Sequence, residues 1–178
     1  MVYQWEGETM GFPEKDIKLM IDGMGIVMYS PKTVEGIESG YNYLKNEYTE
    51  PQQVAEHILK GDMVGFCTGT GGYFTLKIRN GYPAENEYEE YSVGIRLGIE
   101  VRDETICFID LFWLSEWEDD FCPPKQRIHV PNGYYHVTIL TRKPKSGIWG
   151  DNQEICVYLN PLNEMPELKW NGVPMLFT

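Results

Sequence analysis

The ten residues 92–101, SVGIRLGIEV, constrain the fold of this chain more than any other segment. Five apolar side chains, Val93, Ile95, Leu97, Ile99 and Val101, alternate without a break against polar residues and glycines. A period of two places all five on one face of an extended strand, and that face must be covered by another layer of structure. The segment therefore predicts a half-buried β-strand that belongs to a sheet-based core.

Turn signals beside other β-rich runs predict hairpins. RDE at 102–104 precedes TICFIDLF, so 91–112 is expected to form one hairpin. Pro131-Asn132-Gly133 predicts a tight turn between RIHV and YYHVTILTR, and the glycine-rich residues 69–72 predict another between MVGFC and YFTLKIRNG. A further strand, EICVYLNP, is expected to end at Pro161.

Helix signals are fewer. EPQQVAEHILKGD has Pro51 near its start, apolar residues at helical spacing and Gly61 as a stop, which predicts a short helix. A second helix is expected over VEGIESGYNYLKNEY, residues 34–48, against which Gly36 and Gly40 count.

These elements predict a mainly β protein, an antiparallel β-sandwich or barrel decorated by one or two short helices. The length of 178 residues fits one domain, 1–178, with residues 1–60 as an N-terminal elaboration that contains the helices.

The acidic residues are concentrated in one part of the chain. The net charge is −12, and the segment 82–121 alone carries twelve acids and two arginines, a net charge of −10. No segment offers the lysine and arginine footprint that phosphates require, which argues against nucleic acid as a direct ligand and disfavours anionic membrane surfaces. A basic protein partner, a cation or simple solubility remain as explanations.

Large aromatic residues lie among these acids in FIDLFWLSEWEDDFCPP, residues 108–124. Rings supply contact area that loses water on binding, and carboxylates steer a basic partner, so the segment is typical of an interaction surface. The alternative is that Trp113 and Phe121 belong to the core and the acids to a solvated turn. YPAENEYEEY, residues 82–91, repeats the mixture. The candidate partner-binding residues are Trp113, Glu116, Trp117, Glu118, Asp119, Asp120, Phe121, Glu87, Glu89 and Glu90, with the two tryptophans as candidate anchors.

Catalytic patterns are missing from the sequence. GTGGYF lacks the Lys-Ser/Thr that follows the glycines of a phosphate-binding loop. His57 falls on the expected helix, and His129 and His136 flank the Pro-Asn-Gly turn on strands expected to pair, without an evident third partner. We expect no enzyme, although a cleft that placed His129 or His136 beside a carboxylate would favour one.

The cysteines and the N-terminus predict a reduced, cytoplasmic protein without metal or cofactor. The four cysteines, Cys67, Cys107, Cys122 and Cys156, form no CxxC pair, which disfavours a zinc site. No apolar stretch approaches the length of a membrane span, and MVYQWEGETMG lacks the regions of a signal peptide.

The run from about Tyr88 to Leu140 combines SVGIRLGIEV, TICFID, an acidic aromatic connection and RIHVPNGYYHVTIL. This layout resembles that of small acidic bacterial inhibitors, notably the competence nuclease inhibitor and the immunity proteins of polymorphic toxin systems, in which a Pro-x-Gly-Tyr turn likewise joins late strands. The resemblance implies a β-rich, non-catalytic protein that blocks a cationic toxin or nuclease with carboxylates that mimic phosphate. The resemblance does not identify individual contact residues in this chain.

We therefore expect an immunity or inhibitor protein that neutralises a basic toxin or nuclease through an acidic, aromatic-rich face formed by residues 82–121. The alternative is a small-ligand or carbohydrate-binding β-domain without catalysis, in which exposed aromatic rings stack on a sugar.

Overall fold

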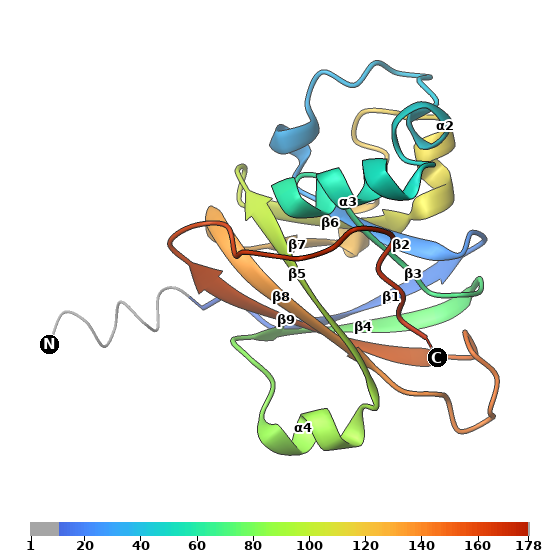
Figure 1. Cartoon of the computed structure of the whole chain (residues 1–178), viewed down its shortest axis with the longest axis vertical. Coiled ribbons are helices and arrows are strands. Elements are labelled where there is room, and N and C mark those ends of the chain that lie inside the picture. Colours follow the sequence, from blue (N-terminus) through green and yellow to red (C-terminus); the bar gives the residue numbers. More distant parts are fainter. Residues whose placement is uncertain (1–10, 178) are drawn as a thin grey trace, which may run out of the picture.

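The computed structural model describes residues 11–177 and has two sheets that pack face to face (Figure 1). The larger sheet has the strand order β1 (Lys15–Ile21), β4 (Gly72–Asn80), β9 (Gln153–Leu162), β8 (Gly133–Thr141) and β5 (Val93–Val101). The smaller sheet has the order β3 (Val64–Cys67), β2 (Gly25–Tyr29), β6 (Thr105–Asp110) and β7 (Arg127–His129). The predicted mainly β sandwich is confirmed. Its pairing is not wholly antiparallel, because β4 and β9 run parallel.

The strands of the predicted hairpins do not pair with each other. β5 pairs with β8, whereas β6 pairs with β2 and β7 in the other sheet. In the same way β3 and β4, and β7 and β8, lie in different sheets. Stacked sheets lie about 10 Å apart, and three or four extended residues span about 10–14 Å. A short connection can therefore cross the core as easily as it can turn back within one sheet, and the three hairpin predictions are wrong for this reason.

The core lies between the two sheets. Leu97 and Ile99 of β5 and Val137 and Ile139 of β8 are completely buried and face Phe108 of β6, also completely buried, across the interior. Burial of one such side chain contributes about 1.5–3 kcal/mol. All residues of β2 are buried, because the connections that carry helices cover the outer face of the smaller sheet as well.

The predicted helix at residue 51 is confirmed as α3 (Pro51–Lys60), which ends at Gly61. Gln53 Oε1 accepts hydrogen bonds from the backbone N–H groups of Glu50 and Thr49, so its first turn is capped. The second predicted helix is shorter than expected. Only α2 (Tyr43–Glu47) forms, because Gly36 and Gly40 have positive φ angles that interrupt a right-handed helix.

Short helices that the sequence did not predict complete the structure: η1 (Pro31–Val34), α4 (Glu85–Glu90), η2 (Leu111–Ser115) and η3 (Pro124–Gln126). The part of the chain expected to be an elaboration, residues 1–60, also supplies β1 to one sheet and β2 to the other. Residues 1–10, which contain most of the segment on which the expectation about a signal peptide rests, lie outside the described residues. Within 11–177 no helix has the length and apolar character needed to cross a membrane.

A buried carboxylate fastens one crossing between the sheets. Asp110, at the end of β6, is 2% exposed. Its carboxylate accepts hydrogen bonds from the backbone N–H groups of Asp22 (2.8 Å), Gly23 (3.3 Å) and Phe112 (2.9 Å). Bonds to an ionised acceptor are stronger than neutral ones, and here they join the β1–β2 connection to the start of η2.

Replacement of Asp110 should destabilise the whole fold. Asp110→Ala leaves three backbone donors without their acceptor, which should lower the free energy of unfolding by on the order of 3 kcal/mol. The matched control is Asp22→Ala, an exposed carboxylate in the same connection, which should change it by less than about 0.5 kcal/mol. Urea unfolding followed by tryptophan fluorescence measures both. Equal, small effects would show that the Asp110 carboxylate does not hold the crossing.

Candidate functional site

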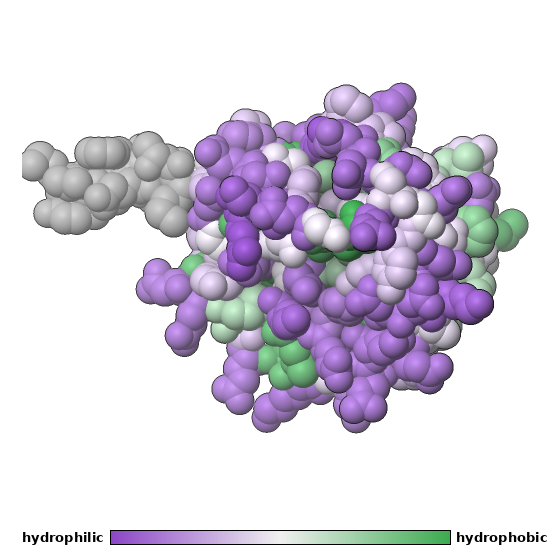
Figure 2. Space-filling view, turned by 90° about the horizontal axis from the view of Figure 1, so that it is seen from above, coloured by the Kyte–Doolittle hydropathy of each residue, from purple (hydrophilic) through white to green (hydrophobic). Residues whose placement is uncertain are grey.

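A pocket of about 510 Å³ opens where η1, α2 and α3 meet. Figure 2 looks onto this end of the molecule, whose visible surface is mostly hydrophilic with a few apolar residues near its middle. The lining residues that can carry charge or stack are Glu35, Glu38, Glu47, Asp62, Lys60, His57, Tyr41 and Tyr43. Carboxylates thus outnumber the single lysine in this lining.

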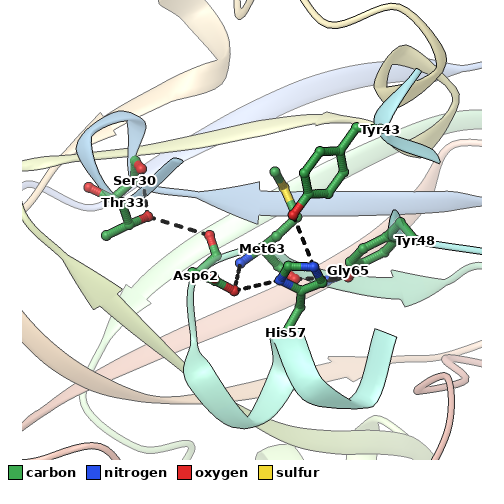
Figure 3. Close-up of polar contacts among 8 residues, drawn as sticks. All are labelled: Ser30, Thr33, Tyr43, Tyr48, His57, Asp62, Met63 and Gly65. Carbon is green, nitrogen blue, oxygen red and sulfur yellow. Dashed lines mark hydrogen bonds and ion pairs between the residues drawn. The ribbon is translucent and has the colours of Figure 1, made fainter. Parts of the chain in front are cut away.

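A chain of hydrogen bonds forms one wall of the pocket (Figure 3). Tyr43 of α2 lies with its hydroxyl 2.9 Å from Nε2 of His57 on α3, and Nδ1 of the same imidazole lies 2.9 Å from Oδ1 of Asp62. The Asp62 carboxylate also accepts from the backbone N–H of Met63 at 2.8 Å. The Thr33 hydroxyl of η1 approaches the Asp62 carbonyl oxygen at 3.5 Å.

The proton positions in this chain follow from the tyrosine. Burial, together with the carboxylates of Asp62 and Glu47, raises the pKa of the Tyr43 hydroxyl well above its ordinary value. Tyr43 therefore stays protonated. Because the carboxylate of Asp62 can only accept, Nδ1 of His57 carries the hydrogen that is donated to it, and Nε2 of the neutral imidazole accepts from the Tyr43 hydroxyl.

The chain of hydrogen bonds positions the pocket walls. Both nitrogens of His57 are engaged, so the imidazole has no free atom with which to take a proton from a bound molecule. Nearby, the buried Tyr48 hydroxyl donates to the Met63 carbonyl (2.9 Å) and accepts from the Gly65 N–H (2.8 Å). Together these bonds hold α2 and α3 against β3.

Two loops distant in the sequence are joined beside the pocket. The Gly40 N–H donates to the Trp117 carbonyl at 2.7 Å, and the Trp117 N–H donates to the Tyr41 carbonyl at 2.9 Å. The Ser39 hydroxyl donates to the Glu118 carboxylate at 2.9 Å. We call the exposed carboxylates of these loops and of α2 the acidic surface. It consists of Glu35, Glu38, Glu47, Glu116, Glu118, Asp119 and Asp120.

The Trp117 side chain packs under the two joined loops and holds them in position. Its side chain is 4% exposed and packs on the rings of Tyr29, Tyr43 and Phe121, with centroids 5.5, 6.4 and 4.9 Å away. A buried indole cannot serve as an anchor on a partner unless the loop opens. Trp113 and Phe121 are half-buried and pack on each other at 5.6 Å. The exposed ring of this segment is Phe112, which is 58% exposed.

The other three predicted partner-binding residues lie elsewhere. Glu87, Glu89 and Glu90 belong to α4, which lies at the opposite end of the molecule from α2 and η2 (Figure 1). Glu87 accepts from the Ala84 N–H, and Glu90 pairs with Arg142 at 2.8 Å. Residues 82–121 therefore do not form one acidic face.

The two remaining histidines are separated, because β7 and β8 do not pair. His129 lies 3.3 Å from Glu104 beside a surface cavity of about 420 Å³, with side chains 76% and 56% exposed. No serine, cysteine or threonine is among the residues described around that cavity. His136 is hydrogen-bonded to Tyr82 at 3.0 Å. The structure thus places His129 beside a carboxylate at a cavity, the arrangement that the sequence analysis named as favouring an enzyme, although both side chains are exposed.

The described residues contain no group of three or more histidine, cysteine or carboxylate side chains arranged to hold a metal ion. All four cysteines are free; Cys67 is half-buried and the others are buried.

Comparisons with known proteins establish the fold. No family model matches the chain, and no curated protein matches its sequence. Among solved structures, "Crocagin biosynthetic gene J" is similar, with a TM-score of 0.54 at 12% identity over 84% of this chain and 98% of that chain. A second, ComJ from Bacillus subtilis, described as an inhibitor of the DNA degrading activity of NucA, has a TM-score of 0.47 at 11% identity over 85% of this chain and 99% of that chain. The likeness to the first of these structures concerns the fold alone.

The proton positions in the pocket wall can be tested directly. In ¹⁵N-detected imidazole spectra near pH 7.5, His57 should show the neutral form with hydrogen on Nδ1. Tyr43→Phe removes its donor and should lower the free energy of unfolding by about 1 kcal/mol, whereas Tyr41→Phe, at a half-buried ring outside the chain of bonds, should have little effect. A wild-type His57 with its hydrogen on Nε2 would contradict the assignment.

Proposed function

We propose that this protein is an inhibitor or immunity protein that binds a basic protein, such as a nuclease or a toxin, through the acidic surface. The observation that carries the proposal is the joining of two loops, 35–41 and 116–120, by backbone hydrogen bonds. Those bonds gather at one end of the molecule carboxylates that lie some 80 residues apart in the sequence. In line with the sequence, the proposed protein is cytoplasmic and non-catalytic.

The electrostatics of this surface favour a cationic partner. Like charges held within about 10 Å repel one another at physiological salt, so their clustering costs stability in the free protein. A partner that carries lysine and arginine relieves this repulsion, and the field of the carboxylates accelerates its approach. Glu35 links the two parts of the surface, since it lines the large pocket and also a cavity of about 130 Å³ that contains Asp119 and Asp120.

The pocket supplies a place for one side chain of the partner. Its lining combines carboxylates with the half-buried ring of Tyr41, the chemical groups that bind a guanidinium by ion pairing and by cation–π contact. The proposed binding residues are therefore the acidic surface and Tyr41. Trp117 takes a supporting role under the loop, and the acids of α4 are left out.

The partner can be identified by affinity capture from cells of the source organism at low and at high salt, followed by mass spectrometry. A basic protein that is retained at low salt and released at high salt, and whose nuclease or toxic activity falls on addition of this protein, is the expected result. Retention without loss of that activity would contradict an inhibitory role.

Charge reversal at matched positions tests the surface itself. Glu38→Lys with Asp119→Lys should slow association with the captured partner about tenfold or more and flatten its salt dependence. The control, Glu85→Lys with Glu89→Lys on α4, changes the net charge equally at exposed positions without polar contacts and should leave association within about twofold. Asp120 is left unchanged, because its φ of 59° is unfavourable for lysine. Stopped-flow mixing gives the rates, and equal slowing by both pairs would overturn the proposed location.

A further inference from the structure

The outer face of the larger sheet contains a buried hydroxyl without a partner. Thr138 of β8 is 1% exposed, and its Oγ1 has no hydrogen-bond partner within the described residues. Three residues further along the same strand, Thr141 is also buried, but its hydroxyl donates to the Glu154 carbonyl at 2.7 Å and accepts from the Gln153 amide at 2.9 Å. A buried hydroxyl without a partner is costly, so Thr138 marks a place where a partner is missing.

Thr138 is one of the residues that line a pocket of about 290 Å³ beside α4, which we call the α4 pocket. Its lining includes the rings of Tyr88 and Tyr91, the side chains of Ser92 and Arg96, and the exposed Gly94, which leaves room on the strand surface. The volume is at the lower limit of small-molecule sites, which begins at about 300 Å³.

Arg96 supplies a free positive charge at this position. It is the cross-strand partner of Thr138, so both side chains project from the same face of the sheet. One of its nitrogens donates to the Tyr88 hydroxyl at 2.7 Å, and the guanidinium lies 5.6 Å from the ring centre of Tyr82. No carboxylate of the described residues lies within ion-pairing distance of it. Arg142, also beside α4, is instead paired with Glu90.

We propose that the α4 pocket binds a small carboxylate with a flat body. Its oxygens accept hydrogen bonds from Arg96 and Thr138, and its body packs on the rings of Tyr88 and Tyr91. The pocket is rich in donors, so a ligand must bring acceptors, and an arginine without a carboxylate partner matches a carboxylate better than it matches a neutral group. Of the four acids of α4, Glu90 is paired with Arg142 and Glu87 caps the helix, whereas Glu85 and Glu89 are exposed to water, which screens their charge.

This site is separate from the proposed inhibitory surface. α4 and the acidic surface lie at opposite ends of the molecule (Figure 1), so one can be present without the other. The α4 pocket also gives the small-ligand alternative from the sequence a specific binding site. The ligand proposed for that site is a carboxylate and not a sugar.

The first experiment tests, in the ligand-free protein, whether the Thr138 hydroxyl lacks a hydrogen-bond partner. Thr138→Val keeps the side-chain shape and removes the unpaired group, so the melting temperature should stay the same or rise. Thr141→Val, the matched control in the same strand, breaks two hydrogen bonds and should lower it by about 3 °C or more. A fall of that size for Thr138→Val would show that the hydroxyl already has a partner and would overturn the argument.

Ligand binding is tested with defined probes, by titration into ¹⁵N-labelled protein followed by NMR. Benzoate should shift the signals of residues 88–96 and 138–140 with a Kd on the order of millimolar or tighter. Benzyl alcohol and methyl glucoside, its neutral counterparts, should bind at least about tenfold more weakly. Equal binding of a neutral probe, or shifts spread over the whole surface, would overturn the carboxylate assignment.

Two variants test which side chains bind benzoate. Thr138→Val and Arg96→Gln should each weaken benzoate binding about tenfold or more, the usual effect of a hydrogen bond to a charged group. The control Arg102→Gln alters an exposed arginine outside the pocket and should bind as the wild type does. Unchanged affinity in both pocket variants would show that the probe sits elsewhere.

Discussion

The structure depends on short connections that join a strand of one sheet to a strand of the other. The connections of three or four residues, 22–24, 68–71, 102–104 and 130–132, each carry the chain from one sheet to the other. The two strands that each of these connections joins therefore lie in different sheets and do not pair with each other. Neither sheet can bury its apolar face without the other, so the interior forms as one unit from contacts of long sequence separation.

The longer connections have a different role. Residues 30–63 and 111–126 each return to the smaller sheet, and between them they carry η1, α2, α3, η2 and η3. Residues 81–92 link two strands of the larger sheet and carry α4. The acidic surface is built on the first two, and the third supplies the tyrosines of the α4 pocket, whose Arg96 and Thr138 lie on β5 and β8. The short crossings thus supply a rigid scaffold, and the long connections add chemically varied side chains at its two ends.

Much of the strand content could be predicted from the sequence, and the strand partners could not. Alternation such as that from Val93 to Val101 reports that one face is buried, and this holds whether the next strand lies beside it or across the core. The helix at Pro51 was predictable because both of its ends are marked locally. Glu35 and Glu38 could not be assigned to the surface that contains Glu118, because their proximity depends on a tertiary contact between loops about 80 residues apart. Trp117 was misplaced for a related reason, since the rings that bury it come from distant segments.

The parallel pairing of β4 with β9 has a consequence for the order in which the chain can fold during synthesis. β9 lies between β4 and β8, so it fills the middle of the larger sheet, although it is made after every other strand of residues 11–177. Until residue 162 has left the ribosome, the β1–β4 pair and the β5–β8 pair have no strand to join them, and each presents an open edge. The emerging chain must therefore hold two half-sheets apart from other strands until its final strand inserts, and a ribosome that stalled shortly before this point would leave both edges unpaired.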